Sequence, residues 1–212
     1  MVNLGDIRRQ YTQGRLDEQT AADDPMTQFH AWFEQYRGTD PLEPTIMTVA
    51  SVDGDGQPWQ RILLLKAYDA NGFVFFTNYE SNKGRHFAAN ARASLHFFWM
   101  NLERQVQVQG CVEKISRAET EAYFHSRPRE SQLGAWASAQ SRPLADRAAL
   151  EAEFARVSAQ YDGQEIPLPD YWGGYRLTPA RMEFWQGGEH RLHDRLEYLP
   201  QAGGWKKQRL NP

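Results

Sequence analysis

The sequence predicts a mainly β protein of the α+β class, an antiparallel β-barrel with helical insertions. Short segments rich in β-branched and aromatic residues, separated by Gly, Asn and Asp turn signals, occupy residues 45–115. A segment with a helical pattern follows over 116–161, and β-rich segments return after it. Because the helices are grouped and do not alternate with strands, a barrel with insertions is favoured over a parallel βαβ fold.

The individual elements follow from local composition and turn signals. A first helix is predicted around 29–33, and a strand over 45–52 ends at the turn sequence DGDG. Pro128 and Pro143 break the helical block, because proline cannot continue a helix. The other predicted elements are strands over 59–68, 72–78, 93–100 and 104–115, a short helix over 81–91, and strands over 174–177, 181–186, 191–198 and 205–210.

The predicted strand 104–115 alternates between apolar and polar side chains. Val106 and Val108 are expected on one face, and three uncharged glutamines on the other. The single cysteine, Cys111, lies in the same valine-rich stretch and is predicted to be a small buried hydrophobic residue, in preference to a catalytic thiol.

Length and composition predict a flexible N-terminal segment, residues 1–24, followed by one domain, residues 25–212. The segment is polar and lacks the apolar core of a secretory signal. No stretch approaches the roughly 20 apolar residues of a membrane span. A net charge of −3 argues against nucleic-acid binding, and a lone cysteine is typical of a reducing cytoplasm, the expected location.

The segment FWQGGEHRLHDR concentrates imidazole and positive charge in a slightly acidic chain. If 191–198 is a strand, Arg191, His193 and Arg195 project from one face, where an anion or an electron-rich ring would compensate their repulsion. One alternative is a metal site at His190 and His193, which the neighbouring permanently charged guanidinium groups disfavour. Another is a solvated strand paired with nearby carboxylates.

Three further groups carry the residue types that bind phosphate. Arg61 and Lys66 close the ends of four consecutive aliphatic residues, which indicate a strand buried on both faces with two anion sites roughly 17 Å apart; alternatively, both cations only reach solvent. Tyr123, Arg127 and Ser131 surround a helix start and can form a phosphate cradle. A second strand-to-helix junction over 77–83 offers Thr, Ser and Lys.

In this order, the motifs RILLLKAYDANGFVFFTNYESNKG, LERQVQVQG, YFHSRPRESQLGAWASAQS, YWGGYR and EFWQGGEHRLHDRLEY resemble the pyridoxamine (pyridoxine) 5′-phosphate oxidase family. The resemblance runs from about Arg8 to the last residues. It implies a homodimer of FMN-binding split β-barrels, with two FMN sites at the subunit interface; no metal is predicted. It also implies that an N-terminal segment closes over the site, chiefly through Arg8 and Tyr11.

The family's functional residues map onto named positions of this chain. FMN contacts are implied for Arg61, Ile62, Leu63, Leu64, Leu65, Lys66, Phe76, Thr77, Asn82, Lys83, Gln105, Gln140, Ser141, Trp185 and Arg195. Substrate contacts are implied for Arg8, Tyr11, Lys66, Tyr123, Arg127, Ser131, Arg191 and His193, the last two being catalytic. The chain departs from the family at Asn82, where Arg is usual, and at Phe76, where Tyr is frequent.

The implied activity is the FMN-dependent oxidation of pyridoxamine 5′-phosphate or pyridoxine 5′-phosphate to pyridoxal 5′-phosphate, in vitamin B6 metabolism. A hydride would pass from the substrate C4′ carbon to flavin N5, and O₂ would reoxidise the flavin to give H₂O₂. One rival is a related flavin oxidase acting on a substrate such as a phenazine precursor. Another is a non-catalytic carrier of flavin or pyridoxal phosphate.

Overall fold

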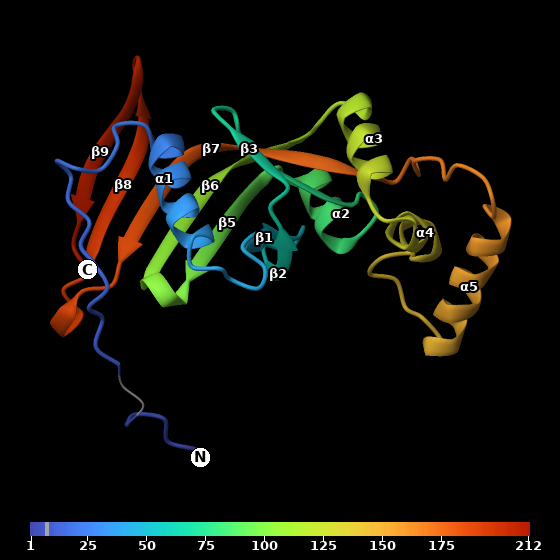
Figure 1. Cartoon of the computed structure of the whole chain (residues 1–212), viewed down its shortest axis with the longest axis horizontal. Coiled ribbons are helices and arrows are strands. Elements are labelled where there is room, and N and C mark those ends of the chain that lie inside the picture. The colour runs from blue at the N-terminus through green and yellow to red at the C-terminus, as the bar shows by residue number, and fades with distance from the viewer. Residues whose placement is uncertain (7–8) are drawn as a thin grey trace.

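The computed structural model of the chain describes residues 1–6 and 9–212, so the predicted substrate contact of Arg8 lies outside the described residues. Its strands form one antiparallel sheet in the order β2-β1-β5-β6-β7-β4-β3, and β8 and β9 continue it from β7. In Figure 1, helices α3, α4 and α5 lie at one end of this sheet, and β8, β9 and the C-terminus lie at the other. The prediction of a mainly antiparallel β fold with helical insertions is confirmed.

The elements occur in the predicted order. The helices are α1 (Pro25–Arg37), α2 (Asn82–Ala89), η1 (Met100–Leu102), α3 (Arg117–Ser126), α4 (Arg129–Ala137), α5 (Arg147–Gln160) and η2 (Glu189–Arg191). The strands are β1 (Ile46–Val52), β2 (Pro58–Leu64), β3 (Ala67–Asp69), β4 (Gly72–Asn78), β5 (Arg92–Trp99), β6 (Arg104–Lys114), β7 (Trp172–Gln186), β8 (Asp194–Gln201) and β9 (Gly204–Leu210). Among the described residues, no helix is long and apolar enough to cross a membrane.

The main core lies between helix α1 and the sheet. Asp24 caps α1 by accepting a hydrogen bond from the Thr27 amide, and Pro25 occupies the first turn, where its missing N–H costs nothing. The helix buries Phe29 completely, and that ring meets Phe73 and Phe97 of the sheet at centroid distances of 4.8 and 5.0 Å. These aromatic contacts fix the sheet that carries the candidate site.

Two predicted strand boundaries are wrong. The predicted strand 59–68 is divided into β2 and β3, because the chain changes its pairing partner at Leu65 and Lys66, from β1 to β4. The predicted strands 174–177 and 181–186 are one strand, β7. It continues through Pro179 with a bulge at Ala180, the extra residue of β7 between Arg181, which pairs with Gln109 of β6, and Pro179, which pairs with Gly110.

The prediction of a strand from residue 191 is also wrong. The strand β8 starts at Asp194, and Glu189–Arg191 form a 3₁₀ turn in which His190 and Arg191 have positive φ values of 55° and 66°. Arg191 therefore does not share a strand face with His193 and Arg195. Two adjacent left-handed residues cannot continue an extended strand, and the sequence pattern gave no sign of them.

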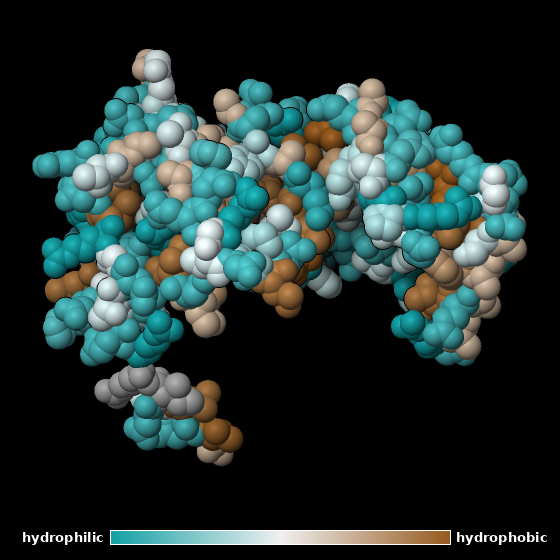
Figure 2. Space-filling model, viewed as in Figure 1, coloured by the Kyte–Doolittle hydropathy of each residue, from teal (hydrophilic) through white to brown (hydrophobic). Residues whose placement is uncertain are grey.

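Two burial predictions are wrong as well. β2 is an edge strand, and the Ile62 side chain is 59% exposed, so the aliphatic run is not buried on both faces of the single chain. Figure 2 shows hydrophobic atoms exposed in the middle of one face, over β1 and β2. Cys111 is exposed because it alternates with the buried Val112 and so shares the outward face of the β6 glutamines. The inward positions of Val106 and Val108 are confirmed.

Candidate functional site

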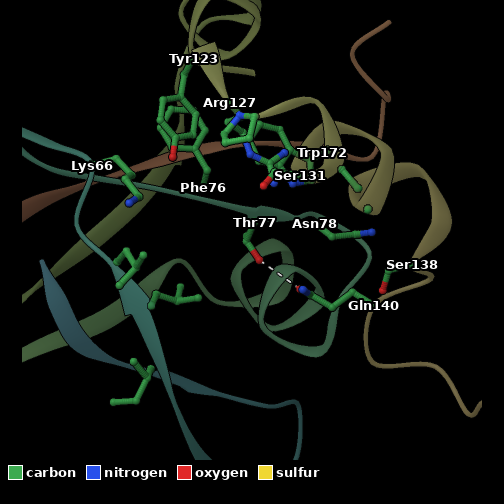
Figure 3. Close-up of a pocket in the computed structure, with 16 residues that line it drawn as sticks. Lys66, Phe76, Thr77, Asn78, Tyr123, Arg127, Ser131, Ser138, Gln140 and Trp172 are labelled. Carbon is green, nitrogen blue, oxygen red and sulfur yellow. Dashed lines mark hydrogen bonds between the residues drawn. The ribbon is translucent and has the colours of Figure 1, made fainter. Parts of the chain in front are cut away.

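A cavity of about 680 Å³ opens where β4 meets the helical insertion. The side chains that line it come from the end of β2 and the Lys66 that follows it, from β4, from α3 and α4 with the loops after them, and from the start of β7 (Figure 3). The structure gathers here many of the residues that the sequence predicts for phosphate and cofactor binding: Ile62, Leu63, Leu64, Lys66, Phe76, Thr77, Tyr123, Arg127, Ser131 and Gln140.

One wall of the cavity is a stack of aromatic rings. Phe76 lies face to face with Tyr123, at a centroid distance of 3.8 Å, and with Trp172, at 5.5 Å. The guanidinium carbon of Arg127 lies 4.6 Å from the Trp172 ring centroid, a cation–π contact that holds Arg127 in place. Trp172 was not predicted as a site residue, although it is the second residue of the quoted motif YWGGYR.

Arg127 is a half-buried cation without an acidic partner. Burial lowers the pKa of its guanidinium, and its Nη1 atom is buried with no hydrogen-bond partner. No ion pair involves Arg127 among residues 1–6 and 9–212. Since an unpaired buried donor costs free energy, the arrangement favours an anionic ligand beside Ser131 and Tyr123.

Lys83 is a second cation, buried at the start of α2. Its side chain is 7% exposed, and Nζ donates hydrogen bonds to Gln140 Oε1 at 2.7 Å and to the Thr77 and Ser81 hydroxyls at 3.1 and 3.2 Å. All three acceptors are neutral. Burial, with a smaller contribution from the positive charge of Arg61, lowers the pKa of Lys83 to about 8.

Arg61 is held beside the same junction by a short chain of hydrogen bonds. Its Nη1 donates to the Val49 carbonyl at 3.1 Å and to Ser51 Oγ at 2.9 Å, and Ser51 Oγ lies 3.0 Å from His86 Nδ1. Ser51 Oγ accepts from Arg61 and still has its own hydrogen, which it can donate to His86 Nδ1 when that ring nitrogen is unprotonated. Burial lowers the pKa of Arg61 and, together with the Arg61 charge, that of His86.

Two other predicted cofactor residues flank these cations. Asn82 is the first residue of α2, and its Oδ1 accepts a hydrogen bond from Arg85 at 2.5 Å, so a guanidinium lies next to the position where the family usually has Arg. Ser141 follows Gln140 in an exposed loop with a positive φ of 69°. Ser51 and His86 were missed, because neither lies in a phosphate-binding motif and they meet only through the fold.

The remaining predicted residues gather at the opposite end of β7. His193 lies 4.7 Å from Trp185 and 5.6 Å from Tyr11, ring centroid to ring centroid, and Tyr11 lies 5.7 Å from Trp185. His193 Nδ1 accepts a hydrogen bond from the Gly188 amide at 3.1 Å. Burial and the charge of Arg191 lower the pKa of His193, which favours the neutral ring with its proton on Nε2.

Two more predicted cofactor residues belong to this end. Gln105 pairs with Trp185 across β6 and β7, and its Oε1 lies 3.0 Å from His96 Nε2. Arg195 pairs with Trp185 across β7 and β8, and its Nε donates to the buried Glu183 at 2.8 Å. Arg195 is thus neutralised by a carboxylate, in contrast to the cations at the other end.

The structure therefore places the predicted site residues in two separate groups. The first group, called the phosphate half, consists of Lys66, Tyr123, Arg127 and Ser131. The second, called the imidazole half, consists of Tyr11, Trp185, Arg191 and His193. Trp172 and Gln186 are the two ends of the 15-residue strand β7. At about 3.3 Å per residue the two halves lie roughly 45 Å apart in one chain.

The antiparallel sheet, the aromatic wall and the cations without carboxylates indicate the class of protein: one that binds flat ligands carrying an anionic group. The chain belongs to the pyridoxamine 5′-phosphate oxidase family. Residues 27–161 match the family described as pyridoxamine 5′-phosphate oxidase, and residues 172–212 match its C-terminal dimerisation region. This confirms the resemblance that the sequence motifs suggested.

Relatives of known name match over the full chain. The pyridoxine/pyridoxamine 5′-phosphate oxidases of Pseudomonas paraeruginosa and of a Synechocystis strain are each 52% identical, with 99% and 100% of this chain and 99% of each relative covered. The crystal structure of PhzG from Burkholderia lata 383 in complex with tetrahydrophenazine-1-carboxylic acid has a TM-score of 0.87 at 30% identity, covering 93% of this chain and 98% of PhzG. The predicted split-barrel fold is therefore confirmed.

Proposed function

We propose that this chain oxidises pyridoxamine 5′-phosphate or pyridoxine 5′-phosphate to pyridoxal 5′-phosphate, with FMN as cofactor and O₂ as the final acceptor, giving H₂O₂. The observation that carries the proposal is the pair of at least partly buried cationic sites without carboxylates, at Arg127 and at Lys83 with Arg61. Two phosphorylated ligands account for both. The names of the full-length relatives support the same activity, and we place the enzyme in the cytoplasm as a homodimer.

The residues at the junction of β4 and α2 fit the phosphate of FMN. Lys83 donates to the Thr77 hydroxyl, Arg61 is near enough for its charge to act on Lys83, and the lowered pKa of Lys83 indicates a charge that lacks its counterion. FMN, when bound, supplies the two-electron acceptor for the reaction. The neutral Asn82 leaves this phosphate site with two cations, so binding does not depend on a third.

The phosphate half fits the substrate. Figure 3 shows Tyr123, Arg127 and Ser131 together at one side of the cavity, with Lys66 nearby and Thr77 hydrogen-bonded to Gln140 on the other side. Arg127 would hold the substrate phosphate, assisted by the two hydroxyl groups. The bound phosphate would fix the orientation of the pyridine ring. Binding energy at the phosphate would thus increase the reaction rate by holding the reacting carbon in place.

The imidazole half must reach the same substrate from a second copy of the chain. The distance along β7 prevents His193 from meeting a molecule held by Arg127 of its own chain. In a homodimer the two halves would complete each other. His193 would then donate its Nε2–H to the phenolic oxygen of the substrate, and Arg191 would add a fixed positive charge that orients the ring.

The visible spectrum of the purified protein tests the proposal. We expect a flavin band that bleaches on anaerobic addition of pyridoxamine 5′-phosphate and returns with H₂O₂ on admission of air. The Arg127→Ala variant should keep its flavin and bleach only at much higher substrate concentration, whereas Arg147→Ala, on the exposed surface of α5, should behave like the wild type. A yellow protein that never bleaches would indicate a flavin carrier.

A phenazine-type oxidation is the second candidate, because PhzG was solved with tetrahydrophenazine-1-carboxylic acid and shares this fold at 30% identity. A substrate without a phosphate does not need Arg127, Ser131 and Tyr123 together. Comparing turnover of pyridoxine 5′-phosphate with that of unphosphorylated pyridoxine separates the two. Equal turnover of both, unaffected by Arg127→Ala, would favour the second candidate.

A further inference from the structure

The carboxylate of Glu103 connects the N-terminal segment to the rest of the chain. Glu103 follows η1 with a left-handed backbone, φ 55°, and only 1% of its surface is exposed. Its Oε2 accepts hydrogen bonds from the amides of Thr12, at 2.7 Å, and Gln13, at 3.0 Å, and its Oε1 lies 3.0 Å from an Arg9 guanidinium nitrogen. Among the described residues, all these partners of the carboxylate come from residues 9–13.

These contacts determine where the Tyr11 ring lies. Tyr11 stands between Arg9 and Thr12, and its ring makes edge contacts with Trp185 and His193. The approach is close, because a Cβ atom at Gly187 would come within 2.9 Å of Tyr11 Cβ. The Gly187 amide in turn donates to the Glu103 carbonyl at 2.8 Å. The backbone and the side chain of Glu103 thus hold both partners of the contact.

We propose that Glu103 is a positioning residue, which fastens residues 9–13 so that Tyr11 covers Trp185 and His193 and raises the affinity for the phosphorylated pyridine. The inference rests on the proposed function, because it assigns His193 to the substrate site. A purely structural role for a buried carboxylate predicts lost stability alone. The geometry gives Glu103 a more specific effect, because its hydrogen bonds hold a short segment that bears a residue of the site.

Amide hydrogen exchange tests the attachment without any turnover. In the FMN-loaded full-length protein, the amides of Thr12 and Gln13 should be protected. Glu103→Ala should raise their exchange rates by about tenfold or more, since each loses a charge-assisted acceptor. Glu103→Gln keeps an acceptor oxygen and should retain most of the protection. Glu113→Ala removes the same charge at the far end of β6 and should leave both amides unchanged.

A double-mutant cycle tests whether Glu103 acts through Tyr11. We expect Glu103→Ala and Tyr11→Ala each to raise the KM for pyridoxamine 5′-phosphate, and the Kd of added pyridoxal 5′-phosphate, by about tenfold, with little change in kcat or FMN content. The double variant should be no worse than Tyr11→Ala alone, because both changes remove one contact. Glu113→Ala should match the wild type.

The outcomes separate this inference from the proposed function. Additive effects of Glu103→Ala and Tyr11→Ala, or unchanged exchange at Thr12 and Gln13, would overturn the positioning role. A wild-type protein that binds pyridoxal 5′-phosphate but does not turn over pyridoxamine 5′-phosphate would overturn the proposed activity. The Kd cycle would then still decide the role of Glu103.

Discussion

Individual charges carry most of the functional information in this chain. Arg61, Lys83 and Arg127 are at least partly buried, and their hydrogen-bond acceptors among the described residues are neutral oxygens or absent. Arg195, also predicted to bind cofactor, is instead paired with Glu183. The resemblance identified all four cations from the sequence, but it could not show which of them is paired with a carboxylate. That distinction depends on which acceptors the fold places within reach.

The ionisation of Lys83 predicts a pH dependence of FMN binding. Its pKa in the ligand-free protein is lowered to about 8, so the cation that attracts phosphate is present below pH 8 and is lost as the pH rises through that value. The Kd of FMN, measured by quenching of flavin fluorescence, should rise several-fold between about pH 7 and 9. Lys83→Arg should remove this dependence, because a guanidinium stays charged. A wild-type Kd that is constant over this range would contradict the assignment.

The hydrogen-bond chain behind Arg61 predicts a second effect on FMN. Ser51→Ala removes the hydroxyl that joins Arg61 to His86, and leaves Arg61 Nη1 with the Val49 carbonyl alone. The freed guanidinium should bind FMN about three- to tenfold more weakly, consistent with the loss of one hydrogen bond to a charged group. Titration of the apoprotein with FMN measures it. Thr20→Ala removes an exposed hydroxyl that donates a hydrogen bond to the Asp17 carbonyl, and it should leave the Kd of FMN unchanged.

At the scale of elements, the structure matches the sequence pattern wherever side chains alone determine it. The alternation of β6 and the presence of the short helix α2 were both evident from residue type. The start of β8 was not, because the left-handed His190 and Arg191 are non-glycine residues that no turn signal marks. The exposed face of β2 was missed for another reason. Position at a sheet edge is a property of topology, which hydrophobicity does not reveal.

Helix α2 offers a prediction about packing. A Cβ atom on Gly84 would lie 2.0 Å from the Tyr79 carbonyl oxygen, so the helix approaches the preceding turn as closely as glycine allows. Gly84→Ala should lower the free energy of unfolding by about 2 kcal/mol or more, and weaken FMN binding by displacing the adjacent Lys83. Urea unfolding and FMN titration measure the two effects.

Gly134 in α4 is the matched control. A Cβ atom there would meet nothing within 4 Å, and the helix disfavours glycine. Gly134→Ala should therefore raise the free energy of unfolding by about 0.5–1 kcal/mol. If both alanine variants were destabilised equally, the clash of the new Cβ atom with the Tyr79 carbonyl would not explain the lower stability of Gly84→Ala.

At the scale of the whole molecule, the chain holds two half-sites and the resemblance supplies the dimer that would join them. Sequence motifs identified members of both halves. They could not show that the halves lie at opposite ends of β7. The order of motifs along the chain does not give the distance between their side chains in the folded protein. The division into a flexible segment 1–24 and a domain 25–212 stays a prediction, although Leu16 and Ala21 are buried in the main core.

Mixed dimers test the division of the site. Arg127→Ala and Arg191→Ala homodimers should both have very low activity. A heterodimer of the two has one site with both substitutions and one with neither, so equal co-expression should restore about a quarter of wild-type activity by random assembly of a two-fold dimer. Activity of the co-expressed mixture measures it, and separately tagged, purified heterodimers should have about half of the wild-type activity, because one of their two sites is intact. If Arg127 and Arg191 served the same site from one chain, mixing would restore nothing.

The unbroken strand β7 makes the spacing between the half-sites rigid. Trp172 at its start and Trp185 near its end each take part in a ring contact, and both must keep their present orientation. Inserting a single residue between them would turn one of the two indoles to the reverse side of the pleat and lengthen the span by about 3.3 Å. Insertions and deletions should thus be tolerated in the loops of this protein but not between Trp172 and Trp185.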